Sequence, residues 1–236
     1  MLFRSRSFIK GTALGGVGIS SFSNIQEANK KSDINSEFYV TIDEQKVSFY
    51  SNIIKEKLKI VHIADTHLFM DDDRGIPFQE YSNRMAKAYN QTTHFKNRKK
   101  TNPNECFENT LTYAKEIKAD LIALVGDIFS FPSELAIEWV LSKLDETGIP
   151  YVYVAGNHDW HYEGMSGNLD LLRNTWINKR LLPLYQGNNP LMAAYDIKGI
   201  RFLAIDNSTY EINKDQLKFF SSHARLSEKI ILEKMK

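Results

Sequence analysis

The chain has 236 residues, 42% of them hydrophobic and 12% aromatic, which is enough for one ordinary domain with a short extension. Its formal net charge of +1, from 30 basic and 29 acidic residues, gives no sign of nucleic-acid binding through bulk charge. The single cysteine, Cys106, excludes an intrachain disulfide framework.

Residues 1–30 are typical of an export signal with a spacer. The first ten residues carry three basic side chains and no acid, residues 12–22 form a glycine-rich apolar run, and a polar stretch follows. The sequence RSRSFIK resembles the twin-arginine export motif, although Ser5 separates its arginines. We expect export to the periplasm by this route or the general secretory route; the alternative is a disordered basic tail on a cytoplasmic protein. Beyond this leader, no apolar run is long enough to span a bilayer.

The remaining residues, 31–236, are interpreted as one domain. Residues 37–51 alternate between apolar and polar side chains, which predicts a β-hairpin turning at Asp43–Gln45. The apolar run Leu58–Ala64 predicts a central strand buried on both faces. Residues 69–104, rich in charged and amide side chains, are interpreted as an insertion, more typical of a solvated loop than of a substrate-specific one.

Strands and helices then alternate along the chain. A helix is predicted from Asn104 or Pro103, a buried strand at Leu121–Val125, a helix capped by Ser133, and a third strand from Tyr151. This order indicates βαβ units with a parallel sheet, an α/β fold. After it, the sequence predicts a hairpin turning at Lys198–Gly199, a helix over Asn213–Ala224 and a short strand at Lys229–Glu233.

Side chains able to bind metal or transfer protons follow all three strands: Asp65 and His67, then Asp127, then Asn157, His158 and Asp159. Each group alone is also typical of an ordinary capped or Asn-rich turn without a functional role. Ligands of open α/β sheets bind outside the carboxyl ends of the strands, so the three groups together predict one site.

The first two groups offer a carboxylate, an imidazole and a second carboxylate. Asp65 and His67 are two residues apart and would project to the same side in extended geometry. These donors suit zinc, iron or manganese, and Asp127 has two oxygens with which it could bridge two cations.

The third group follows Gly156, which permits a sharp turn out of the strand. Asn157 offers a neutral amide oxygen as a ligand. His158 is placed to transfer a proton or hold a substrate anion, and Asp159 could orient its imidazole through a hydrogen bond. We take His158 and Asp159 as the candidate catalytic residues.

In this order the motifs resemble those of the calcineurin-like metallophosphoesterases. Their pattern runs Asp-x-His, Gly-Asp, Gly-Asn-His-Asp or Glu, a lone histidine, then Gly-His-x-His, and this chain matches the first three blocks between Leu58 and the C-terminus. The resemblance implies a β-sandwich flanked by helices. It also implies hydrolysis of phosphate mono- or diesters by a hydroxide that two divalent ions (manganese, iron or zinc) activate.

The resemblance also implies a role for each matched residue. Asp65 and His67 would bind the first metal ion, and Asn157 would bind the second. Asp127 would bind both metal ions, and His158 would assist catalysis. Asp206, which follows a predicted strand, sits where relatives often place an aspartate, and a supporting role is expected for it.

The lone histidine and the Gly-His-x-His block have no match here, since His161 and His223 are the histidines that follow Asp159. We therefore expect a truncated member, incomplete at its C-terminus, that could hold one metal instead of two. The partner expected is a phosphate-ester substrate, and no basic, aromatic-laced groove indicates nucleic acid. The alternative function is a catalytically inactive remnant that binds at most one metal.

Overall fold

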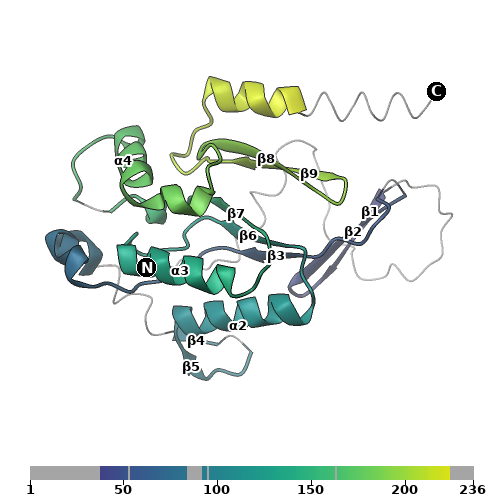
Figure 1. The fold of residues 1–236 in the computed structure, drawn as a ribbon, viewed down its shortest axis with the longest axis horizontal. Coiled ribbons are helices and arrows are strands. Elements are labelled where there is room, and N and C mark those ends of the chain that lie inside the picture. The colour runs from purple at the N-terminus through teal and green to yellow at the C-terminus, as the bar shows by residue number, and fades with distance from the viewer. Residues whose placement is uncertain (1–37, 53, 84–91, 95, 163, 224–236) are drawn as a thin grey trace, which may run out of the picture. The chain divides into compact units, whose positions relative to one another are not determined.

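The computed structural model describes residues 38–52, 54–83, 92–94, 96–162 and 164–223 (Figure 1). The predicted leader and the predicted strand at Lys229–Glu233 lie outside these residues. The chain divides into two compact units, up to Lys55 and from Glu56 onward. Among the described residues, no helix is both long enough and apolar enough to cross a membrane.

The first unit contains the predicted hairpin. Strands β1 (Phe38–Asp43) and β2 (Lys46–Ser51) pair antiparallel around a two-residue turn whose first residue, Glu44, has a φ of 44°. The turn lies within the predicted Asp43–Gln45, so this prediction is confirmed. On one face, the Tyr39 and Tyr50 rings stack with centroids 4.4 Å apart.

The second unit is built on a parallel sheet of β3 (Ile60–Ile63), β6 (Leu121–Val125) and β7 (Tyr151–Val154), in the order β3-β6-β7. Helix α2 (Pro103–Glu116) lies in the crossover from β3 to β6, and α3 (Glu134–Asp145) in the crossover from β6 to β7. The predicted βαβ units are therefore confirmed.

Both crossover helices begin at polar caps. Pro103 occupies the first turn of α2, as predicted, and the Asn102 side chain accepts a main-chain N–H from that turn at 2.9 Å. Ser133 caps α3 in the same way at 3.1 Å, and its hydroxyl also donates to the main-chain oxygen of Met70. Ser133 thereby joins the start of α3 to the segment that follows β3.

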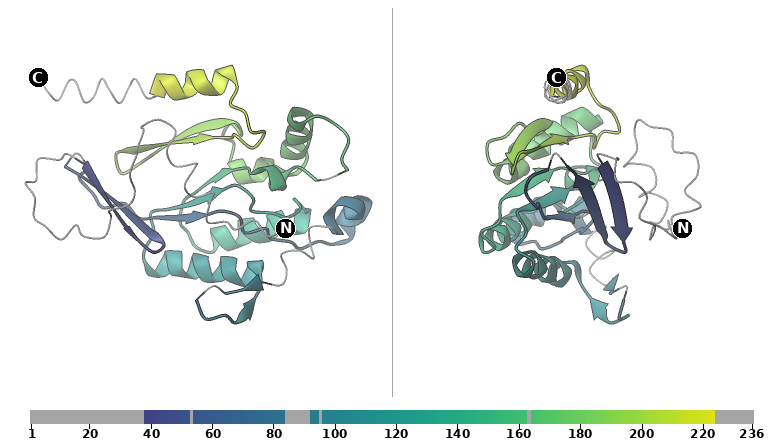
Figure 2. Two further views of the ribbon diagram at one scale, coloured as in Figure 1. Left: turned by 180° about the vertical axis from the view of Figure 1, so that it is seen from behind. Right: turned by 90° about the vertical axis from the view of Figure 1, so that its right-hand side faces the viewer.

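The second unit is built in layers (Figures 1 and 2). Helices α2 and α3 cover one face of the parallel sheet, and a hairpin of β8 (Met192–Ile197) and β9 (Ile200–Ile205) covers the other. The hairpin face of the core is formed by six side chains: Leu121, Ala123, Val152, Tyr195, Ile197 and Phe202. Two sheets packed in this way, with helices outside, form the predicted sandwich.

Two predictions about the first half of this unit need correction. Strand β3 is not buried on both faces, because Ile60 and His62 are exposed while Val61 and Ile63 are buried. Within the described residues β3 lies at the sheet edge, and β6 is its strand partner. Residues 69–104 are not a plain loop either, since they include the 3-10 helix η2 (Asp73–Phe78) and the paired strands β4 (Thr92–Thr93) and β5 (Lys100–Thr101).

Further helical segments follow the sheet. The 3-10 turn η3 (Asn157–Asp159) comes after β7. The chain then forms α4 (Leu169–Trp176), the π-helix η4 (Ile177–Leu181) and the 3-10 helix η5 (Leu182–Tyr185), none of which the sequence predicted. Residues 214–223 are helical, in agreement with the prediction, and Asn213 and Gln216 exchange side-chain hydrogen bonds at the start of this helix.

Candidate metal centre

The pairing of β3 with β6 continues beyond both strands into the predicted site. The main-chain N–H of Asp65 donates to Gly126 at 3.1 Å, and that of His67 donates to Asp127 at 3.0 Å. A bridge between Leu68 and Phe129 closes this extension. The first two predicted groups are therefore held beside each other at the carboxyl edge of the sheet.

Asp65, His67 and Asp127 all have left-handed main-chain torsions, with φ values of 54°, 48° and 53°. The prediction that Asp65 and His67 share a side through extended geometry is therefore wrong, because β3 ends at Ile63 and both residues have left-handed torsions. Such torsions cost about 1–3 kcal/mol each for residues other than glycine, and they cluster at functional sites. Their coincidence at three candidate ligands indicates a built site.

The three side chains converge. Asp65, His67 and Asp127 each offer one donor atom, and these atoms lie within 4.8 Å of one another. His67 is buried, Asp127 half-buried and Asp65 exposed, so the group opens to solvent on one side. Two carboxylate oxygens and an imidazole nitrogen suit manganese, iron or zinc, and the residues present fit a divalent cation.

The electrostatics of the group favour a cation. Burial, followed by the negative charge of Asp127, raises the pKa of Asp65. Burial, followed by the nearby His158, lowers the pKa of His67 to about 4. The His67 imidazole is therefore neutral at pH 7 and has a lone pair to offer, and a cation would relieve the repulsion between the two carboxylates.

His158 joins this group from the turn after β7. Its main-chain N–H donates to Asp127 Oδ1 at 2.9 Å, and its ring meets the His67 ring edge to face with centroids 5.0 Å apart. The Tyr162 hydroxyl donates to the main-chain oxygen of His158 at 2.6 Å. Asn157 precedes His158 in η3, and its main-chain oxygen accepts the N–H of His161 at 2.7 Å. The structure thus brings His158 of the third predicted group against the first two groups.

The hydrogen bond predicted between Asp159 and the His158 imidazole is absent. The Asp159 carboxylate is fully buried and accepts the main-chain N–H of Phe129 at 2.8 Å and of Gly156 at 2.9 Å. His158 Nδ1 is buried and has no hydrogen-bond partner among the described residues. Asp159 therefore ties the turn after β7 to the segment that follows β6.

Two glycines let the turns approach closely. A Cβ atom on Gly156 would overlap the main-chain nitrogen and carboxylate of Asp127. Gly126 has a φ of 84°, and a Cβ atom there would lie 3.3 Å from Gly156 Cα. The sequence predicted the turn at Gly156, but the contact with Asp127 is a tertiary effect that local sequence does not contain.

Asp206 lies in a buried polar cluster behind the turn after β7. It is fully buried, and burial raises its pKa, while Ser208 hydrogen bonds and Arg173 oppose this effect. Sequence reasoning predicted a supporting role for Asp206 but missed Arg173 and Ser208. Arg173 lies in an amphipathic stretch, where an arginine ordinarily reads as a solvated residue, so no sequence signal identifies it.

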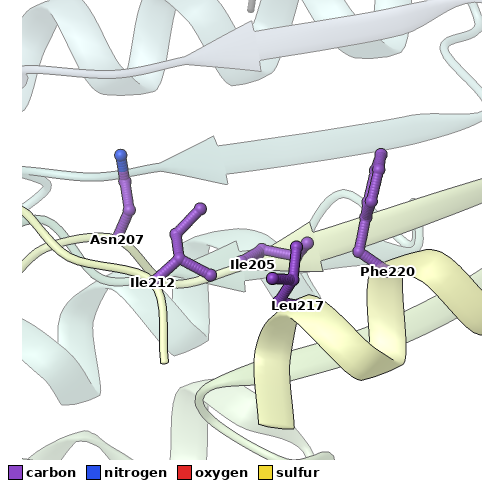
Figure 3. Close-up of a pocket in the computed structure, with 5 residues that line it drawn as sticks. All are labelled: Ile205, Asn207, Ile212, Leu217 and Phe220. Carbon is purple, nitrogen blue, oxygen red and sulfur yellow. The ribbon is translucent and has the colours of Figure 1, made fainter. Parts of the chain in front are cut away.

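A separate apolar pocket of about 390 Å³ is lined by Ile205, Asn207, Ile212, Leu217 and Phe220 (Figure 3). Ile205 comes from β9, and Leu217 and Phe220 come from the helix at residues 214–223. None of the predicted metal ligands lines it.

Comparison with known proteins places these features in a family. Residues 58–234 match the family model described as calcineurin-like phosphoesterase. The chain belongs to this family. Because the match covers most of the chain and includes Asp65, His67, Asp127 and the turn after β7, the family resemblance seen in the sequence is confirmed.

Individual relatives match over shorter stretches. A protein of Moraxella catarrhalis (strain BBH18) named probable cyclic nucleotide phosphodiesterase is 42% identical over 50 residues, which are 21% of this chain and 18% of that protein. One with the same name from Psychrobacter arcticus (strain DSM 17307 / VKM B-2377 / 273-4) is 39% identical over 46 residues, 20% of this chain and 16% of that protein. The crystal structure of a dimetal phosphatase from Danio rerio matches 63% of this chain and 44% of that one, with 15% identity and a TM-score of 0.38. The matches thus span less than half of each relative.

Proposed function

We propose that this chain is a metal-dependent phosphoesterase that hydrolyses phosphate esters at the Asp65–His67–Asp127 group. The observation that carries this proposal is the convergence of three donor atoms within 4.8 Å, all on residues with left-handed torsions, at the carboxyl edge of the sheet. Membership of the calcineurin-like phosphoesterase family supports the reaction class.

In this proposal the chain's own residues divide the work. Asp65, His67 and Asp127 would hold one divalent cation, and Asp127 and Asn157 would hold a second. Bound divalent cations lower the pKa of a water molecule and neutralise phosphoryl oxygens. The charge of two divalent cations exceeds that of the two carboxylates, so the site attracts an anionic ester. His158 lies against Asp127 and His67 and supplies a proton to the leaving oxygen.

The finer proposal for the substrate is a phosphodiester. Two relatives carry the name probable cyclic nucleotide phosphodiesterase, although their matches cover a small part of each protein. A phosphodiester carries one negative charge, shared by its two non-bridging oxygens, which bound divalent cations would neutralise while His158 donates a proton to the leaving oxygen.

The test is hydrolysis by the full chain, with Mn²⁺, of p-nitrophenyl phosphate and of bis(p-nitrophenyl) phosphate. We expect faster turnover of the diester, and loss of turnover by a factor of about 10³ or more in Asp127→Ala, since metal binding and the position of His158 both depend on this residue. Asp145→Ala, an exposed aspartate in α3, is the matched control and should keep full activity.

The alternative function is a chain that binds one cation without turnover. The observation that favours it is the single three-residue donor group within the described part of the chain. A folded chain that binds Mn²⁺ through Asp65, His67 and Asp127 but hydrolyses neither ester would establish this alternative and refute the phosphoesterase proposal.

A further inference from the structure

A series of buried hydrogen bonds joins the turn after β7 to the loop after β9. The indole Nε1–H of Trp160 donates to the Ser208 hydroxyl at 2.9 Å. The Ser208 hydroxyl and main-chain N–H both donate to Asp206 Oδ1, at 2.5 and 2.7 Å. Arg173 Nη1 lies 3.7 Å from the same oxygen. All four residues are buried, and Trp160 and Asp206 are fully so.

The direction of these hydrogen bonds follows from the chemistry of the groups. An indole nitrogen can only donate, so the Ser208 oxygen must accept from Trp160. The one hydroxyl hydrogen of Ser208 then points to Asp206, whose carboxylate is an acceptor. Without the hydroxyl, the indole N–H would be buried and unpaired, which native structures rarely tolerate.

The far end of the series is anchored to two helices. Arg173 lies in α4 and donates to Asp170 of the same helix at 2.8 Å. The Gln216 side chain, in the helix at residues 214–223, donates to the main-chain oxygen of Asp206 at 2.5 Å and to that of Leu191 at 2.9 Å. Asp206 is thus fixed by its side chain and by its backbone.

The near end of the series lies directly beside the metal centre. Trp160 follows the η3 turn, and its main-chain N–H donates to Asn157 at 3.3 Å. The turn is therefore held from two sides, by Asp159 through Phe129 and by Trp160 through Ser208. A shift of the indole would move the residues that carry the Asn157 amide and the His158 imidazole.

We propose that Arg173, Asp206 and Ser208 act through the Trp160 indole as positioning residues that hold Asn157 and His158 against Asp127. Their consequence for metal binding rests on the proposed function, whereas their effect on the turn is independent of any metal. None of the three touches the donor group of Asp65, His67 and Asp127 in the hydrogen bonds described, so they are not catalytic residues.

The test compares the full-length protein with its Ser208→Ala and Ser208→Thr variants by NMR, without metal. The signals followed are the Trp160 indole N–H, assigned with Trp160→Phe, and the His158 ring nitrogens. We expect Ser208→Ala to speed exchange of the indole hydrogen about five- to tenfold, as one lost hydrogen bond would, and to shift the His158 signals. Ser208→Thr keeps the hydroxyl, so its indole exchange rate and its His158 signals should match those of the wild type.

Ser222→Ala is the matched control. Ser222 is exposed on the helix at residues 214–223, and its hydroxyl donates to the main-chain oxygen of Phe219. This variant should leave the Trp160 and His158 signals unchanged. The proposal is overturned if Ser208→Ala lowers the melting temperature but leaves the His158 signals in place, since the series would then support the fold alone.

A Mn²⁺ titration of the same samples separates this inference from the proposed function. We expect Ser208→Ala to weaken Mn²⁺ binding about two- to fivefold while Ser208→Thr retains wild-type affinity, since outer partners orient metal ligands. If the wild-type chain binds no Mn²⁺, the proposed function fails, and the His158 signals of the metal-free protein still decide the positioning role.

Discussion

At the level of single residues, the candidate site carries unfavourable terms, and a cation would relieve one of them, the repulsion between the Asp65 and Asp127 carboxylates. Asp65, His67 and Asp127 hold left-handed torsions, and the two carboxylates repel each other within one small group. Functional sites often carry such costs because they pre-organise ligands. Removing one carboxylate charge should therefore raise the stability of the metal-free chain and lower its affinity for metal.

Asp65→Asn tests this opposition. Neutralising Asp65 removes its repulsion with Asp127, so we expect the metal-free variant to be more stable by about 0.2–1 kcal/mol, the range of partly exposed charge pairs. Its melting temperature should rise less than that of the wild type when Mn²⁺ is added. Thermal melts with EDTA and with Mn²⁺ measure both effects, with Asp145→Asn as the control. A metal-free variant that is less stable than the wild type would contradict the account.

Asp159→Asn tests the buried carboxylate through pH. Burial raises the pKa of Asp159 to about 7, against 3.8 in the unfolded chain. The folded state thus holds a proton that the unfolded state releases, so this contribution to stability is complete below about pH 4 and is lost as pH rises to about 7. The Asp159→Asn variant lacks this pH-dependent contribution to stability. Its side-chain NH₂ also faces a main-chain N–H donor, and this mismatch costs about 1–3 kcal/mol of stability.

We therefore expect Asp159→Asn to destabilise the metal-free chain more at pH 5 than at pH 7.5. Urea unfolding of both proteins at the two pH values measures the difference. Because both proteins contain His67, its own titration cancels in this comparison. An equal loss of stability at both pH values would show that Asp159 does not titrate in this range.

At the level of helices and strands, the candidate metal centre depends on how closely three strand ends approach one another. The β3–β6 pairing extends through Asp65 and His67, and Gly156 leaves room for Asp127 beneath the turn after β7. Strand ends of a parallel sheet meet at one edge, but their spacing there depends on the absence of a side chain at Gly156.

Gly156→Ala should therefore displace Asp127 and lose metal affinity. Gly156 has a φ of −93°, which alanine also adopts, so the cost is steric and amounts to about 1–3 kcal/mol of overpacking. Gly187→Ala is the matched control, because Gly187 has a φ of 80° and open space around it, and its cost of about 1 kcal/mol is backbone strain alone. Calorimetric Mn²⁺ titration should show weaker binding in Gly156→Ala and unchanged binding in Gly187→Ala. Equal affinity in all three proteins would contradict this role of Gly156.

Local sequence predicts the elements of this fold well where period and caps agree. Short stretches of sequence were enough to predict five features: the strands at Leu121 and Tyr151, the helix starts at Pro103 and Ser133, and the hairpin turn at Lys198. Local patterns do not predict which segment packs against each face of a strand. An apolar run predicted β3 as a central strand, although its exposure depends on which segments cover it.

In the second unit as a whole, the packing of helices, sheet and hairpin brings residues that are distant in sequence to one edge of the sheet. The helices and the β8–β9 hairpin cover opposite faces of the sheet, which leaves the carboxyl edge for the site (Figure 2). The candidate site residues could be named from the sequence because each follows a strand. The left-handed torsions, the main-chain hydrogen bonds of Asp159 and the burial of Arg173 depend on tertiary contacts, so local sequence did not predict them. Export through residues 1–30 stays a prediction.

The proposed function requires that Asp65, His67 and Asp127 together hold a divalent cation. A crystal structure of the full chain grown with Mn²⁺, with anomalous data at the manganese edge, would show whether they do. We expect an anomalous peak at coordination distance, about 2.0–2.3 Å, from one atom of each of the three side chains. A well-ordered Asp65–His67–Asp127 group without such a peak would contradict the account.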